Sequence, residues 1–242
     1  MVFWRANIGL VCPGPSPTVE TDFHRYAPKG VGISTMHIPW AVKGGDPTPE
    51  NLLAMVKGLE EGCKGFYDPR IHQDVIIFGC TSGSLIGGPN FDKECIKVIE
   101  DTTGTKGLTT STAILMAVDV LNTDRLAVFT PYPDATNEAE KVFLEKNGVA
   151  VTTIKGINPQ NKYIPAVDPK DIYQEIKKID LKDANGIFIS CTGLDCTEII
   201  PLLEVDYGLP VITSDQASLW ASLRAARVGD RILKLGKLCT EF

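Results

Sequence analysis

Short apolar runs alternate with longer amphipathic stretches along the whole 242-residue chain. The short runs are rich in β-branched and aromatic residues and are bounded by turn residues, a pattern typical of strands buried on both faces of a parallel sheet. The longer stretches between them have the periodicity of helices. We therefore predict an α/β fold with strands at residues 7–12, 30–37, 74–79, 126–130, 149–154, 186–190 and 209–213.

Two helix starts carry clear signals. Thr48 is followed by Pro49, and Asp168 by Pro169. A Thr or Asp side chain can accept a hydrogen bond from the free N–H groups of a first turn, and proline suits that turn because it has no N–H to satisfy. The polar segment 156–167 joins a strand to the second of these helices, so we expect a binding loop or a lid there.

The chain also contains a rough tandem repeat. Residues 8–13 (IGLVCP) and 126–131 (LAVFTP) are both apolar strands that end in proline. Residues 75–81 (VIIFGCT) and 186–192 (GIFISCT) are both apolar strands that end in Cys-Thr. The pairs occur in the same order, so the repeat predicts two α/β units of related structure.

This repeat predicts two pseudo-symmetric domains, each a mostly parallel sheet flanked by helices. We place them at residues 1–114 and 115–217, with a C-terminal helix at 218–242 that packs back on the first domain. Ligands of such sheets bind beyond the carboxyl ends of the strands. The active site is therefore expected in the cleft between the two domains.

Cys80 and Cys191 hold matching places in the two repeats, each between a buried strand and a turn of small residues. Backbone N–H groups and hydroxyls in such a turn stabilise a thiolate. Two thiols on opposite sides of a small carboxylate allow one to act as base or nucleophile while the other delivers a proton. A single cysteine after a strand is more often a buried apolar residue, so the matched pair is what favours catalysis.

The turns after both cysteines can bind a carboxylate through hydroxyls and N–H groups, without a metal or an arginine. The binding residues expected there are Thr81, Ser82, Thr192 and Gly193. Tyr132 lies between two prolines at a strand end, where its phenol either points into the cleft or caps a turn. Asp134 and Asn137 are expected to cap the helix that follows, with a contact to the site as the alternative for Asn137.

Composition narrows the function classes. The 24 Lys+Arg and 30 Asp+Glu give a net charge of −6, which disfavours nucleic acid as a partner. The start of the chain is a poor signal peptide and no run of eighteen apolar residues occurs, so we expect a cytoplasmic protein without a membrane partner. Seven scattered cysteines and three isolated histidines form neither a disulfide framework nor a zinc motif. Nucleotide-binding motifs are also missing, and neither a metal nor a cofactor is expected.

Taken together, these features resemble the aspartate/glutamate racemase superfamily, in the branch that holds maleate cis-trans isomerases and arylmalonate decarboxylases. The resemblance covers nearly the whole chain. It implies two pseudo-symmetric α/β domains with a cofactor-independent site between them, and a homo-oligomer. The motifs that carry it are residues 8–13, 18–23, 79–82, 111–113, 130–132, 190–194 and 208–214.

The resemblance assigns a role to each thiol. Decarboxylases of this branch have glycine where this chain has Cys80, whereas maleate isomerases have both cysteines. By resemblance, the Cys80 thiolate adds to the alkene of maleate, the new single bond rotates, and Cys191 supplies and later retrieves a proton before fumarate leaves. Further substrate-binding residues implied by the family are Pro13, Gly14, Ser16 and Asn161.

This chain departs from the family pattern at the substrate contacts. Ser16 stands where maleate isomerases typically have asparagine, and Asn158 competes with Asn161 for the match in the polar loop. A basic residue after the second strand is replaced by the sequence His37 to Trp40, a more apolar wall that suits a bulkier substrate.

Three hypotheses follow. The favoured one is a two-cysteine isomerase of a small carboxylate, with maleate the best single substrate and an amino-acid or hydroxy-acid racemase as its variant. The second is a lyase that removes carbon dioxide from a substituted malonate with Cys191 as proton donor. The third is a carboxylate sensor in which the cysteines only line a pocket.

Overall fold

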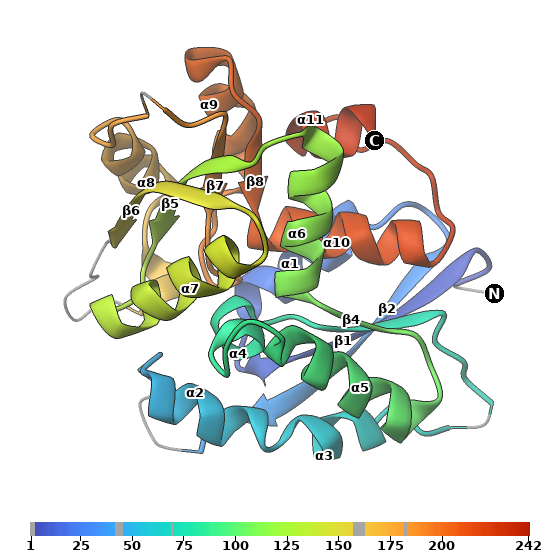
Figure 1. Ribbon diagram of the computed structural model, residues 1–242. Coiled ribbons are helices and arrows are strands. Elements are labelled where there is room, and N and C mark those ends of the chain that lie inside the picture. The colour runs from blue at the N-terminus through green and yellow to red at the C-terminus, as the bar shows by residue number, and fades with distance from the viewer. Residues whose placement is uncertain (1–2, 42–45, 69, 157–162, 182) are drawn as a thin grey trace.

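The computed structural model describes residues 3–41, 46–68, 70–156, 163–181 and 183–242. Two four-stranded parallel sheets flanked by helices make up this part of the chain (Figure 1). The strand order of the first sheet is β2-β1-β3-β4, and that of the second is β6-β5-β7-β8. The same order thus occurs twice, which confirms the predicted α/β fold with two similar domains.

The two sheets are built from consecutive parts of the chain. The first part contains β1 (Ala6–Gly14), α1 (Pro17–Tyr26), β2 (Val31–Pro39), α2 (Pro49–Val56), α3 (Leu59–Lys64), β3 (Val75–Phe78), α4 (Thr81–Leu85), α5 (Phe91–Thr103), β4 (Gly107–Thr109) and α6 (Thr110–Leu121). The second part contains β5 (Arg125–Thr130), α7 (Asp134–Lys146), β6 (Ala150–Gly156), the 3-10 helix η1 (Ile164–Ala166), α8 (Pro169–Ile176), β7 (Gly186–Ile189), the 3-10 helix η2 (Thr197–Ile199), α9 (Ile200–Tyr207), β8 (Val211–Thr213), α10 (Ser214–Ala225) and α11 (Gly236–Glu241).

The register between the central strands repeats as well. The last pair of β1 and β3 is Val11 with Phe78, and that of β5 and β7 is Phe129 with Ile189. In both sheets, therefore, pairing stops two residues before a proline on one strand and two residues before a cysteine on the other. The sequence repeat thus corresponds to equivalent positions in three dimensions.

All seven predicted strands are present, with ends that differ by a few residues. The prediction missed β4, which contains three residues, Gly107–Thr109. A strand this short has no apolar run to mark it, and the neighbouring β3 determines its place by pairing with it. Without β4, the sequence does not reveal that α6 and α10 are equivalent: α6 follows β4 in the first half, and α10 follows β8 in the second.

Both predicted helix starts are confirmed. The Thr48 side chain accepts a hydrogen bond from the N–H of Asn51 at 3.4 Å, at the start of α2. Asp168 Oδ1 accepts one from the N–H of Lys170 at 2.8 Å, at the start of α8. Each bond satisfies an N–H group that has no partner within its helix.

The helices α6 and α10 pack against each other between the two sheets (Figure 1). Helix α10 follows β8 of the second sheet, yet it also contacts α1 and β3 of the first. A single apolar cluster joins both helices to both sheets, and it includes Ile8, Ile77, Val128, Phe188 and Ala221. The two halves therefore share one central core.

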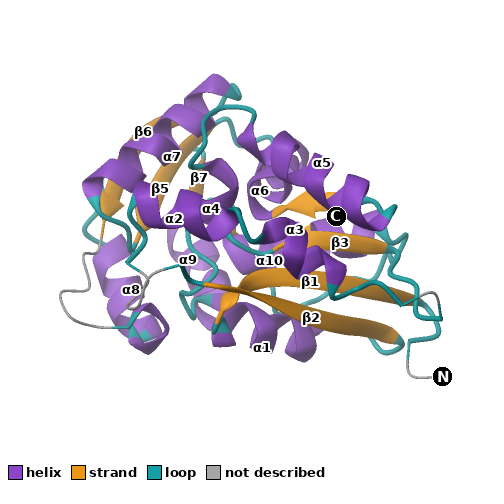
Figure 2. Ribbon diagram, turned by 90° about the horizontal axis from the view of Figure 1, so that it is seen from below, coloured by secondary structure: helices purple, strands orange, loops and turns teal. Residues whose placement is uncertain are grey.

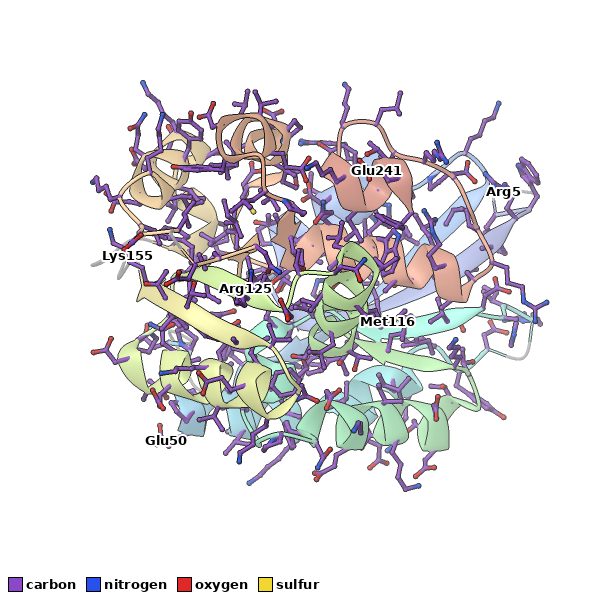
Figure 3. All side chains as sticks on the ribbon, turned by 45° about the horizontal axis from the view of Figure 1, so that its top comes forward. Arg5, Glu50, Met116, Arg125, Lys155 and Glu241 are labelled. Atoms are coloured by element: carbon purple, nitrogen blue, oxygen red, sulfur yellow. The ribbon has the colours of Figure 1, made fainter. Side chains whose placement is uncertain are left out.

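The outer face of each sheet has an apolar cluster of its own. Helices α2, α3 and α5 cover the first sheet, where Phe66 and Phe78 are buried (Figure 2). Around Phe129 and Ile187, helices α8 and α9 cover the second. Charged side chains such as Arg5, Glu50 and Lys155 lie at the periphery of the molecule (Figure 3). Within the described ranges, no helix combines the length and apolar character needed to cross a membrane.

Candidate active site

The turns that follow β3 and β7 bring Cys80 and Cys191 to equivalent places, because parallel strands end at the same edge of a sheet. The hydroxyl of Ser214, at the start of α10, connects the two turns. Its Oγ accepts a hydrogen bond from Thr81 Oγ1 at 2.8 Å and another from the N–H of Cys191 at 3.0 Å. The predicted site thus draws on both halves, and one oxygen atom joins them.

A further bond crosses in the opposite direction. Thr192 Oγ1 donates to the carbonyl of Gly79, the residue before Cys80, at 3.4 Å. The residue after each cysteine therefore bonds to the other half of the molecule. All of these groups are buried, and together they hold the two thiol turns in a fixed relation.

Cys80 is the N-terminal capping residue of α4, and its backbone is extended. Its Sγ accepts a hydrogen bond from the N–H of Gly83 at 3.3 Å. A side chain at position 83 would place its Cβ 2.9 Å from that sulfur, so only glycine leaves room for the bond. Burial raises the pKa of the Cys80 thiol to about 11, while the Gly83 N–H and the Ser82 hydroxyl lower it.

Cys191 lies in a tighter turn without a regular helix directly after it. Its φ of 126° is in the left-handed half of backbone space, which costs a residue with a side chain about 1–3 kcal/mol. Its Sγ accepts a hydrogen bond from the N–H of Gly193 at 3.2 Å. Burial raises the pKa of this thiol to about 12, and the Gly193 N–H and the Tyr132 hydroxyl lower it.

The net direction of these pKa shifts corrects the sequence-based expectation. We expected the turns to lower the pKa of both thiols, and the N–H donors do act in that direction. Burial has the larger effect, because a thiolate loses the solvation of water. In the protein without ligand, both thiols are therefore protonated at neutral pH.

Tyr132 is buried beside Cys191 in the turn after β5. Asn137 holds this turn: its Oδ1 accepts a hydrogen bond from Thr130 Oγ1, and its Nδ2 donates to the carbonyl of Tyr132 at 3.2 Å. Helix α7 is instead preceded by Pro133 at its cap position, without a side-chain cap. The prediction that Asn137 caps this helix is wrong, because its side chain turns back toward Tyr132.

The first turn, after β1, contains three of the predicted binding residues. Pro13 and Gly14 end the strand, and Ser16 precedes α1 with its hydroxyl bonded to the carbonyl of Pro13. Burial raises the pKa of the Cys12 thiol to about 12, and the nearby Ser16 hydroxyl lowers it. Asn161, like Asn158, lies outside the described residues.

Helix α1 supports the Cys191 turn from the other half. Thr18 Oγ1 donates to the carbonyl of Gly193 at 3.1 Å, and Thr197 Oγ1 donates to Asp22 Oδ2 at 2.5 Å. Helix α7 has the corresponding place in the second half and packs on α4, the helix that Cys80 caps. Each cysteine turn is therefore braced by the first helix of the other half.

Two buried carboxyl groups near Cys191 were missed by sequence reasoning. Glu140 accepts a hydrogen bond from Ser190 Oγ at 2.5 Å, and burial raises the pKa of its carboxyl to about 7. Burial raises the pKa of Asp215 well above its ordinary value, and neither carboxyl oxygen has a partner among the described residues. Only the position of Ser214, directly after a predicted strand, could have pointed to this side of the site.

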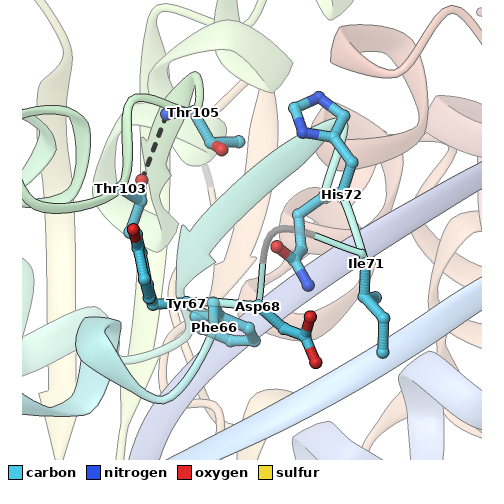
Figure 4. A pocket seen from close by; sticks show the side chains of 8 residues that line it. Phe66, Tyr67, Asp68, Ile71, His72, Thr103 and Thr105 are labelled. Atoms are coloured by element: carbon cyan, nitrogen blue, oxygen red, sulfur yellow. Dashed lines mark hydrogen bonds between the residues drawn. The ribbon is translucent and has the colours of Figure 1, made fainter.

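Two open cavities lie away from the thiols. One of 160 Å³ is found near the amino end of β3 (Figure 4), and its lining residues are Phe66, Tyr67, Asp68, Ile71, His72, Gln73, Thr103 and Thr105. The other, of 360 Å³, lies between α6 and the ends of α7 and β5. Neither is lined by Cys80 or Cys191, whose exposed fractions are 5% and 8%.

The duplicated four-stranded parallel sheet agrees with the two pseudo-symmetric α/β domains that the resemblance implied. A sequence model of the arylmalonate decarboxylase family matches residues 69–239. The match covers more than half of the chain, and the chain belongs to this family.

Characterised relatives include two kinds of enzyme. The arylmalonate decarboxylase of Bordetella bronchiseptica is 26% identical over 237 residues, which cover 92% of this chain and 91% of the relative. The maleate isomerase of Nocardia farcinica (strain IFM 10152) is 23% identical over 243 residues, covering 96% and 94% of the two chains.

A solved structure shares the fold over nearly its whole length. It is a cysteine-to-serine mutant of the Nocardia farcinica maleate cis-trans isomerase with a covalently bound succinylcysteine intermediate. The TM-score is 0.88 at 18% sequence identity, and the match covers 98% of this chain and 99% of that one.

Proposed function

We propose that this protein is a cofactor-independent isomerase that converts maleate to fumarate with Cys80 and Cys191 as its catalytic residues. The observation that carries the proposal is the pair of thiols at equivalent strand ends, connected through Ser214. Two thiols held in this way can act on both sides of one small molecule. The relatives that isomerise maleate support the choice of reaction.

The reaction begins when Cys80 passes its proton to solvent and its thiolate forms a C–S bond to one alkene carbon of maleate. The electron pair of the double bond moves to the neighbouring carbon, which takes the proton of Cys191. The resulting succinyl thioether rotates about its central single bond. Cys191 then removes the proton, the double bond re-forms, and the C–S bond breaks to release fumarate and the Cys80 thiolate.

The pKa shifts fit this division of labour. A proton donor must be protonated before it acts, and burial keeps Cys191 in that state. For Cys80, the Gly83 N–H and the Ser82 hydroxyl oppose the cost of burial and stabilise the attacking thiolate. The succinylcysteine intermediate in the Nocardia farcinica structure supports a covalent route of this kind.

The substrate carboxylates are held by hydroxyls and backbone N–H groups. Those expected to bind them are Thr81 and Ser82 in one half, and Thr192, Gly193 and Tyr132 in the other. The first turn, with Pro13, Gly14 and Ser16, adds contacts near Cys80, and Asn161 adds one from the polar loop. The unpaired state of all seven thiols supports a reducing location such as the cytoplasm.

A second candidate is decarboxylation of a substituted malonate, with Cys191 as the proton donor. The family match and the Bordetella bronchiseptica relative favour it. That reaction leaves Cys80 without a role, because a single proton donor is enough. The two reactions therefore differ in whether Cys80 is needed.

Proton NMR of the full chain in D₂O distinguishes these reactions. Incubated with maleate, the protein is expected to produce fumarate, and phenylmalonate, aspartate and glutamate serve as competing test substrates. Cys80→Ser and Cys191→Ser should each lower the rate by about 10²–10⁴-fold, the usual contribution of one positioned acid or base.

Cys63→Ser is the matched control, because Cys63 is equally buried but lies in α3 on the outer side of the first sheet. It should retain the rate of the unmodified chain. Loss of carbon dioxide from phenylmalonate without any fumarate from maleate would replace the proposal by decarboxylation. Deuterium entering an amino acid without geometric isomerisation would replace it by racemisation.

A further inference from the structure

Three side chains of types that bind metals converge next to the first turn. The sulfur of Cys12, a carboxylate oxygen of Glu20 and a ring nitrogen of His37 all lie within 4.8 Å of one another. His37 Nε2 is 2.7 Å from Glu20 Oε1. The three residues lie in three different elements, β1, α1 and β2, so no closely spaced sequence motif marks them.

Each of the three comes from a regular element. Cys12 in β1 and His37 in β2 are direct partners in the parallel pair, so their side chains emerge on the same face. Glu20 lies in the first turn of α1, which covers that face. A side chain at Gly14 would place its Cβ 3.0 Å from the Cβ of His37, so the glycine leaves room for the imidazole.

The group is open to solvent on one side. Cys12 is fully buried, whereas the side chains of Glu20 and His37 are 27% and 44% exposed. An ion can therefore reach Glu20 and His37 from solvent, with the buried sulfur of Cys12 behind them. The three residues thus form a cup that faces solvent, with the polarisable sulfur of Cys12 at its base.

We propose that Cys12, Glu20 and His37 bind a divalent transition-metal ion, with zinc the best match. Thiolate, imidazole and carboxylate are the ligands that zinc takes in proteins, and three protein ligands leave a fourth position for water. On binding, the Cys12 S–H bond breaks, the sulfur bonds to the ion, and the proton passes to solvent. The charges of the thiolate and the Glu20 carboxylate then balance the two positive charges of the ion.

The site is separate from the thiols proposed for isomerisation, although Cys12 directly precedes the turn that contains Pro13 and Gly14. A bound ion would connect β1, β2 and α1 beside that turn. This proposal does not depend on the maleate isomerase assignment. Metal binding alone tests it.

Cobalt(II) titration of the Cys80→Ser/Cys191→Ser double variant tests the proposal, because this variant removes the two thiols of the proposed active site, and the remaining four besides Cys12 are buried. One equivalent of cobalt(II) should give a thiolate-to-cobalt charge-transfer band in the near ultraviolet. Added zinc should displace the cobalt and abolish the band. His37→Ala should weaken binding roughly 100-fold or more, since even residues behind a ligand contribute about 10–100-fold. Glu20→Gln should also weaken binding.

His24→Ala is the matched control, because His24 is exposed on the same helix as Glu20 and outside the cup. It should bind cobalt as the double variant does. The band should vanish in a Cys12→Ser variant, whose fold is checked by circular dichroism. No band at one equivalent, a band that survives Cys12→Ser, or equal affinity in His37→Ala and His24→Ala would each overturn the proposal.

Discussion

The turns of Cys80 and Cys191 occupy equivalent places in a duplicated topology, yet they hold their thiols differently. Cys80 has an extended backbone and caps a helix, whereas Cys191 has a left-handed backbone and a tight turn. Duplication supplied two similar positions, and local changes then gave each thiol its own surroundings. An enzyme that needs an unlike pair of groups can thus be built from two like halves.

The starts of α6 and α10 show the same divergence. The second residue of α6 is Ser111, whose hydroxyl lies 2.7 Å from Ser84 Oγ beneath the Cys80 turn. The second residue of α10 is Asp215, a buried carboxyl near Cys191 that adds to the effect of burial in raising the pKa of that thiol. The Cys80 side is therefore braced by a neutral hydroxyl pair, and the Cys191 side faces a carboxyl.

The largest expected effect separates the two thiols chemically. If Cys80 is the nucleophile and Cys191 the acid, Cys80→Ser should form no adduct with maleate. Cys191→Ser should accumulate maleate-derived mass on Cys80, because solvent can supply the proton that completes the adduct but no thiolate remains to remove it and let the C–S bond break. Both variants should turn over about 10²–10⁴-fold more slowly. Intact-protein mass spectrometry with peptide mapping measures the adduct, and an adduct found on Cys191 would reverse the assigned roles.

The next effect concerns the residue before each cysteine. Ser190, before Cys191, donates a hydrogen bond to the buried Glu140, whereas the residue before Cys80 is Gly79, which has no side chain to do so. The folded state raises the pKa of Glu140 from 4.5 to about 7, so it binds the proton more tightly than the unfolded chain. Stability should therefore be highest below pH 4.5 for this group and fall as pH rises toward 7, by up to about 3 kcal/mol.

Glu140→Gln keeps an acceptor for Ser190 and removes the titration. Its free energy of unfolding, measured by urea denaturation at several pH values, should lose this decline and exceed that of the original chain at pH 8. Parallel pH profiles for the two proteins would show that Glu140 titrates normally.

Ser214→Ala tests the connection between the two turns. The substitution leaves Thr81 Oγ1 and the Cys191 N–H without their shared acceptor, at a cost of about 1–3 kcal/mol in unfolding free energy. Turnover should fall as well, because both turns lose their common anchor. Ser222→Ala is the control on the same helix, since the Ser222 hydroxyl donates to the carbonyl of Ser218 within that helix. Equal turnover in the two variants would argue against a connecting role.

The smallest expected effect compares the helices that brace the two turns. Thr18→Ala removes the bond to the carbonyl of Gly193 beside Cys191 and should cost about 0.5–1.5 kcal/mol in stability. Thr136→Ala removes a similar bond, to the carbonyl of Pro47. Only Thr18→Ala should also reduce kcat/KM, since its bond ends on a cysteine turn. An equal decrease in kcat/KM in the two variants, measured by steady-state kinetics, would contradict this expectation.

The sequence was informative where structure depends on local pattern. Strands buried on both faces leave continuous apolar runs, and the two runs that end in Cys-Thr led directly to equivalent positions in the sheets. The three-residue β4 left no such run. Helix starts were predictable because Thr48 and Asp168 bond to N–H groups only two or three residues away.

The features that sequence reasoning missed depend on contacts between distant segments. Ser214 meets Cys191 across 23 residues, and Ser190 meets Glu140 across 50. The raised pKa values of both thiols follow from burial, which no single turn determines. Asn137 was taken for a cap because its place before a helix suggests one, while its true partner is the Tyr132 turn behind it.

The packing of α10 against α1 and β3 also constrains how the chain matures during synthesis. The ribosome releases β1 to β4 long before residues 214–225, so the first sheet emerges with part of its apolar face uncovered. That face gains its permanent cover only when almost the whole chain has left the exit tunnel. Chaperone demand should accordingly last until late in translation, and truncation before α10 should leave both sheets prone to aggregation.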